Sequence, residues 1–106
     1  MQLPLAKGDM NKDLDPVRRL ARDLRKEAPR APEEELGGFP EAARCIDKCR
    51  ATLVGWQGEY VYGCPLDQRF LSAAGIGANE LKAFVATGAS DEEIANWIVQ
   101  HTHSTA

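Results

Sequence analysis

The sequence PEAARCIDKCRATLVG, residues 40–55, predicts the helix around which the rest of the chain can be arranged. Its apolar side chains recur at the spacing of one helical face: Ala42, Cys45, Ile46, Cys49 and Leu53. We expect Pro40 in the first turn, where a proline costs no hydrogen bond, and Gly55 at the end of the helix. The charged side chains between the apolar ones fall on the other faces, which we interpret as solvated.

A helix is also predicted over residues 15–28. Asp15 is a favourable N-cap, and Pro16 suits the first helical position because its φ angle is already helical. Apolar side chains then recur at helical spacing until Pro29, which cannot continue a helix. Residues 1–13 show no periodicity, and we expect them to be a flexible lead-in.

Three more helices are predicted in the C-terminal half of the chain. One begins at Pro65, one covers residues 78–87, and the last follows a capping box formed by Ser90 and Glu93. Residues 58–63 are the least regular part, where a short extended segment is an alternative to a loop.

The 106 residues are 43% hydrophobic and 27% charged, which is the size and composition of one globular domain. We therefore expect an all-α, compact single domain of about five short helices over residues 14–101, with residues 102–106 as a C-terminal tail. An odd number of cysteines argues against a disulfide framework, and no apolar stretch reaches transmembrane length. These features favour a cytoplasmic protein with no membrane association.

The net charge of −3 argues against general nucleic-acid binding. Eight of the 13 basic residues lie within residues 1–32, but no aromatic residue occurs before Phe39 to stack on bases. We consider nucleic acid an unlikely partner.

Cys45 and Cys49 are the first candidates for chemistry. At positions i and i+4 of a helix, two thiols project from one face, and such a pair can supply half of a zinc site. However, both lie on the apolar stripe, where a cysteine packs as a small hydrophobic residue. We favour core packing, and we expect no metal and no cofactor.

Cys64 is a different case, because it directly precedes Pro65 at a predicted helix start. Unpaired backbone N–H groups and the helix macrodipole lower the pKa of a thiol there. Asp67 lies three residues further on, where its negative charge opposes thiolate formation, and no histidine base is close in the sequence. Cys64 and Asp67 are weak catalytic candidates; the alternative is a cysteine cap packed against a neighbouring tyrosine.

A third candidate is a polar pocket along the charged edge of residues 40–55. Basic and acidic groups that gather there could bind a small anion or a peptide, and the alternative is a solvated face with weak ion pairs. The candidate ligand-binding residues are Arg44, Asp47, Lys48, Glu59 and Tyr60.

Several short motifs together resemble a small bacterial family that is catalogued as a domain of unknown function (number 5069). The resemblance runs from about Asp15 to His101. It rests on residues 26–30 (KEAPR), 36–38 (LGG), 43–48 (ARCIDK), 58–60 (GEY), 64–67 (CPLD) and 91–93 with Trp97. It implies one contiguous domain in a bacterial cytosolic protein, and it implies no activity.

Two functions remain open. The chain is small and has no assembled nucleophile and base, so we favour a non-enzymatic module that acts through contacts with itself or another protein. The alternative is a small enzyme or ligand-binding protein that uses Cys64 and nearby polar residues; a small-molecule ligand is compatible with either.

Overall fold

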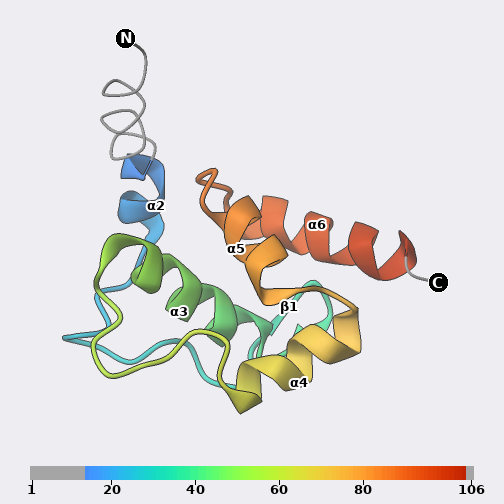
Figure 1. The fold of residues 1–106 in the computed structure, drawn as a ribbon, viewed down its shortest axis with the longest axis horizontal. Coiled ribbons are helices and arrows are strands. Elements are labelled where there is room, and N and C mark those ends of the chain that lie inside the picture. The colour runs from blue at the N-terminus through green and yellow to red at the C-terminus, as the bar shows by residue number, and fades with distance from the viewer. Residues whose placement is uncertain (1–13, 105–106) are drawn as a thin grey trace, which may run out of the picture.

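The computed structural model describes residues 14–104, with side chains up to Thr102. This part of the chain contains five helices and one small sheet: α2 (Asp15–Leu20), β1 (Glu35–Leu36), β2 (Phe39–Pro40), α3 (Ala42–Val54), α4 (Pro65–Ala74), α5 (Ala78–Val85) and α6 (Asp91–Ser104) (Figure 1). The expected class, a mostly helical single domain, is confirmed. The predicted lead-in, residues 1–13, lies outside the described residues.

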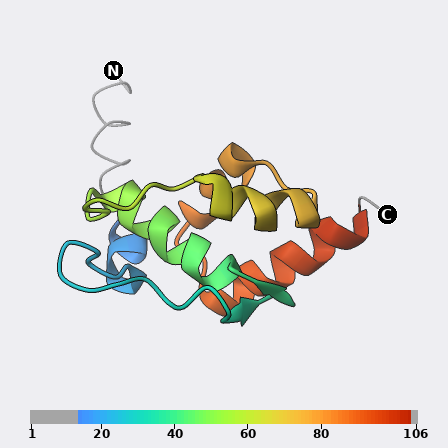
Figure 2. The ribbon, with the colours of Figure 1, turned by 90° about the horizontal axis from the view of Figure 1, so that it is seen from below.

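Helix α3 is the central element. It runs from the β1–β2 hairpin at its N-terminal end to α2 at the other, and it also contacts α4 and α5 (Figures 1 and 2). Its apolar stripe enters the core, where Cys45, Ile46 and Cys49 have no exposed surface. The core is completed mainly from the three later helices, by Phe70, Leu71, Leu81, Val85, Ile94 and Ile98.

The start of α3 differs from the prediction, because Pro40 lies in a strand and not in the first helical turn. Strands β1 and β2 pair antiparallel around Gly37 and Gly38, whose φ angles of +64° and +87° fit a tight two-residue hairpin turn. Glu41 follows with a left-handed φ of 72°, and this turns the chain into the helix. Of the two alternatives at residues 58–63, the structure has the loop and no strand; the described residues form their sheet at 35–40.

The first predicted helix is also shorter than expected. Helix α2 ends at Leu20, and Ala21 is already extended. Leu24 keeps the buried position that the helical pattern gave it, but it does so from a loop whose backbone N–H donates to the carbonyl of Trp56 (3.0 Å). The apolar spacing therefore predicted the burial of Leu24 correctly, but its prediction of a helix was wrong beyond residue 20.

The last three helices follow the prediction more closely. Helix α4 begins at Pro65, and α6 begins with the predicted capping box, in which the Ser90 backbone and side chain bond Glu93 at 2.8 and 3.1 Å. Helix α5 ends at Val85, two residues early, while α6 continues to Ser104 through part of the segment that we expected to be a tail. None of the described helices is long and apolar enough to cross a membrane.

Candidate thiolate site

Three of the four charged side chains of α3 are buried, which corrects our interpretation of a solvated face. Asp47, Lys48 and Arg50 are only 4%, 3% and 4% exposed. Burial of a charge is costly unless the charge is paired, and each of these three has a partner from another part of the chain. The partners divide the charged residues of α3 into two clusters.

The first cluster, which we call the thiolate site, consists of Lys48, Cys64 and Asp67. The Lys48 Nζ atom donates to the Cys64 Sγ atom at 3.1 Å and lies 3.1 Å from Asp67 Oδ2. The Asp67 side chain is 1% exposed, whereas Cys64 is half-buried. One buried ammonium group thus contacts both a buried carboxylate and the sulfur atom of a half-buried cysteine.

The local fold explains this placement. Cys64 is the N-cap residue of α4, with an extended backbone, and Asp67 lies in the first helical turn. Asp67 Oδ2 also accepts a hydrogen bond from the Gly63 backbone N–H (2.8 Å), which ties the turn before Cys64 to the helix. The other carboxylate oxygen, Oδ1, is buried and has no hydrogen-bond partner among the described residues. Such an orphaned acceptor is uncommon and typical of functional or strained sites.

The surroundings of Cys64 favour its thiolate form. Partial burial acts to raise the pKa of the thiol, but the backbone N–H of Asp67 and the Lys48 ammonium group outweigh that effect, so the pKa is lowered. The carboxylate of Asp67 opposes this through its negative charge. The helix N-terminus thus acts on the sulfur through the backbone N–H groups of Asp67 and Leu66, both of which lower the pKa of Cys64.

Lys48 remains charged in this site. Its burial acts to lower the pKa, and its hydrogen bonds to Cys64 and Asp67 outweigh burial, so the pKa is raised. The ammonium group in contact with the sulfur therefore increases the thiolate fraction of Cys64. We expected a tyrosine beside Cys64, and the sequence did not identify Lys48 as its partner.

The other two cysteines lie in a contrasting environment. Burial is the main cause that raises the pKa of Cys45, and it raises the pKa of Cys49 to about 12. Both remain protonated thiols packed in the core. Within residues 14–102, no three His, Cys, Asp or Glu side chains are grouped so that they could hold a metal ion.

The second cluster, the arginine–aspartate network, joins α3 to α6 and to the loop before β1. Arg30 binds Asp47 through its backbone N–H (2.8 Å) and its guanidinium group (2.9 Å), and it binds Asp91 at 2.7 Å. Arg50 binds the other oxygen of Asp91 at 2.9 Å and donates to the Ala89 carbonyl at 3.1 Å. The charges of two arginines and two aspartates are thus paired with one another.

The predicted polar pocket is therefore not one site. Arg44 lies over the ring of Tyr60 (5.7 Å) and donates to the Arg30 carbonyl (3.2 Å), while Glu59 is exposed. Asp47 belongs to the arginine–aspartate network and Lys48 to the thiolate site.

The structural roles of Arg30, which lies in a loop between Pro29 and Pro32, and of Asp91 were not predicted from the sequence. The available signal was weak: a basic residue between prolines, 17 residues before a buried aspartate.

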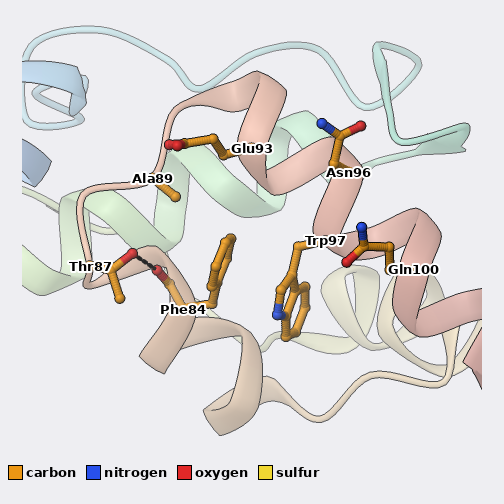
Figure 3. Close-up of a pocket in the computed structure, with 7 residues that line it drawn as sticks. All are labelled: Phe84, Thr87, Ala89, Glu93, Asn96, Trp97 and Gln100. Atoms are coloured by element: carbon orange, nitrogen blue, oxygen red, sulfur yellow. Dashed lines mark hydrogen bonds between the residues drawn. The ribbon is translucent and has the colours of Figure 1, made fainter.

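A shallow pocket of about 310 Å³ lies elsewhere, between α5 and α6 (Figure 3). The ring of Phe84 stacks on Trp97 with a centroid distance of 5.1 Å, and both rings face the pocket. Polar side chains at the rim include Glu93 and Asn96. This pocket is apolar in its walls and holds no candidate for bond-making chemistry.

Comparison with known protein families identifies the family to which the chain belongs. A family model described as a domain of unknown function (DUF5069) matches residues 26–106, which is most of the sequence. The chain therefore belongs to this family, as the motifs led us to expect. The matched region contains both clusters and all three cysteines. Among curated proteins no match is found.

Proposed function

We propose that the protein is a small thiol protein whose Cys64 reacts, as a thiolate, with small electrophiles of the low-molecular-weight disulfide type. The observation that carries the proposal is the 3.1 Å contact between the Lys48 ammonium and the Cys64 sulfur. A thiolate is the nucleophilic form of cysteine, and a neighbouring cation increases its population at neutral pH. This proposal develops the alternative function and replaces the non-enzymatic module as our first choice.

Each residue of the thiolate site has a distinct part in the proposed reaction. The Cys64 sulfur attacks one sulfur of a small disulfide, the S–S bond breaks, and the second sulfur leaves as a thiolate while a mixed disulfide forms. Lys48 stabilises the attacking thiolate. Asp67 is a positioning residue, because its carboxylate lies 3.1 Å from the ammonium group that contacts Cys64.

The cellular setting that we propose follows from the same chemistry. Three free cysteines, one of them half-exposed, suit a compartment that keeps thiols reduced. We therefore place the protein in the bacterial cytoplasm, where reversible mixed disulfides can form and be reduced.

The proposal is tested by the rate at which Cys64 reacts with iodoacetamide, followed by peptide mass spectrometry between pH 5 and 10. We expect Cys64 to react several-fold faster than free cysteine at pH 7, while Cys45 and Cys49 remain unmodified in the folded protein. The Cys64→Ser variant is the control for the site of labelling. A rate no higher than that of free cysteine at pH 7 contradicts the proposal.

A second candidate is self-association through the pocket between α5 and α6. Its partly exposed aromatic walls favour it, because aromatic side chains are enriched at protein interfaces. Sedimentation velocity over a range of concentrations tests it: Asn96→Arg at the rim should shift a dimer to monomer. A wild-type protein that remains monomeric at high concentration rules this candidate out.

A further inference from the structure

We infer that a peroxide converts the thiolate site into a covalent crosslink, in which the Cys64 sulfur is bonded directly to the Lys48 side-chain nitrogen. This inference rests on the proposed reactivity of Cys64. It goes further because it assigns a modification to Lys48, a side chain that the proposed function uses only as a charge.

The geometry brings the two atoms together before any reaction. Lys48 Nζ lies 3.1 Å from Cys64 Sγ, and the lysine side chain is almost fully buried between α3 and α4. A lysine on the surface samples many rotamers, whereas this one is fixed by its bonds to Asp67 and Cys64. The nitrogen therefore stays in contact with the sulfur while the sulfur changes its oxidation state.

Of the two reacting atoms, only the Cys64 sulfur needs access to an oxidant, and Cys64 is half-buried, so part of it reaches solvent. An accessible thiolate reacts with a peroxide to give a sulfenic acid, which then condenses with a thiol or with a nitrogen nucleophile. The other two thiols are poor competitors, because burial raises the pKa of Cys45 and Cys49 and keeps them protonated.

The reaction is balanced in two steps. First, Cys64 Sγ attacks one oxygen of hydrogen peroxide; an S–O bond forms, the O–O bond breaks and hydroxide leaves, so that sulfur is oxidised and peroxide reduced. Second, the Lys48 ammonium transfers a proton to Asp67, and the neutral amine attacks the sulfenic sulfur. An N–S bond forms, the S–O bond breaks, and the departing hydroxide leaves as water with an amine proton. The proton on Asp67 neutralises the first hydroxide.

Asp67 is suited to this transfer by its position. Its Oδ2 atom already lies 3.1 Å from the ammonium group. In the first step Cys64 loses its negative charge, so one of the two anions that hold the Lys48 proton disappears. The charge balance of the site thus makes the lysine a better nucleophile only after the sulfur has been oxidised.

The experiment treats the reduced full-length protein with an equimolar amount of hydrogen peroxide, without a thiol reductant, and maps the peptides. We expect a crosslinked pair of peptides that joins Lys48 to Cys64, lighter by about 2 Da than the sum of the two. Dithiothreitol should separate them. An excess of dimedone, which traps sulfenic acid, should suppress the crosslink in the wild-type protein and so test the intermediate without a substitution.

Lys48→Arg is the matched variant, since it keeps a positive charge near Cys64 but offers a far weaker nucleophile. Peroxide should give sulfinic acid and no crosslink in this variant, whatever its rate of iodoacetamide labelling. If the wild-type protein alkylates rapidly at Cys64 but peroxide gives only sulfinic acid or a disulfide to Cys45 or Cys49, the crosslink is wrong and the proposed function stands. Slow alkylation of the wild-type protein removes the proposed function itself.

Discussion

The two charged clusters of α3 are built from similar groups and differ in how completely those groups are paired. In the arginine–aspartate network, Arg30 and Arg50 saturate the carboxylates of Asp47 and Asp91. In the thiolate site, one lysine serves both a carboxylate and a sulfur, and one oxygen of Asp67 has no partner within the described part of the chain.

This difference in pairing favours a structural role for the arginine–aspartate network and a chemical role for the thiolate site. A saturated network has no group left to react, and its value lies in joining distant segments: Arg30 is 17 residues from Asp47 and 61 from Asp91. An unsaturated cluster with a half-buried nucleophile can change its bonding without loss of the fold. The comparison predicts that substitutions in the network will reduce stability, and that substitutions in the thiolate site will mainly change reactivity.

The largest effect is expected for Asp47→Ala. The substitution leaves Arg30, whose side chain is 17% exposed, without its main partner and also removes the acceptor of its backbone N–H. We expect a loss of about 3–5 kcal/mol in the free energy of unfolding, measured by urea denaturation. In the fraction that remains folded, the rate of Cys64 alkylation should not change. A loss below about 1 kcal/mol would show that the network is not structural.

Lys48→Met should have a smaller effect on stability and a larger one on chemistry. The substitution leaves Asp67 buried without a counterion, which costs about 3 kcal/mol, the lower end of the range for a broken buried pair, because Asp67 keeps the hydrogen bond from Gly63. It also removes a cation that lowers the pKa of Cys64, so the alkylation rate at pH 7 should fall. An unchanged rate would mean that the helix N-terminus alone activates the thiol.

Asp91→Asn should cost no more than about 1 kcal/mol, because the Asp91 side chain is 42% exposed and solvent screens its ion pairs. Partial burial acts to raise the pKa of Asp91, and Arg30 and Arg50 outweigh it, so the pKa is lowered. A lowered carboxyl pKa stabilises the fold above the unfolded pKa and ceases to do so as the pH falls through the folded pKa. The stability difference from the wild-type protein should therefore shrink below about pH 4. A difference that is independent of pH would contradict this assignment.

Cys64→Ser should have the smallest effect on stability, within about 1 kcal/mol at pH 7, because the side chain is half-exposed. The pKa of Cys64 is lowered, so its thiolate favours the folded state increasingly as the pH rises from the folded pKa towards that of the unfolded chain. Urea denaturation between pH 6 and 9 should show the wild-type protein gaining stability over the serine variant. A gain in the opposite direction would mean that the folded state raises the pKa.

The sequence predicted those parts of the fold that depend on local signals. Pro65, the Ser90 capping box and the apolar stripe of α3 act within a few residues, and the structure has all three. Helix α2 ended early because Leu24 is buried equally well from a loop that bonds to Trp56, an interaction across 32 residues. Apolar spacing indicates which residues are buried. It does not distinguish a helical backbone from a loop when a distant segment supplies the hydrogen bond.

The site was predictable to the same limited extent. Cys64 could be selected because a helix start is a local feature that acts on a thiol. Its contact with Lys48 depends on how α4 packs against α3, which no sequence spacing encodes. The same applies to Asp47, which we interpreted as solvated and which the fold pairs with Arg30.

Nine of the thirteen residues of α3 are buried on both its apolar and its charged faces, and this has a consequence for how the protein opens. A surface helix can fray one turn at a time, but the amides of α3 become accessible only when the elements around it separate. Its slowest amide hydrogens should therefore exchange with solvent deuterium only through global unfolding, whereas those of the loop after α2 should exchange through local fluctuations. Cys64 then lies beside the helix that we expect to open last among the described elements, and its contact with Lys48 joins it to that helix.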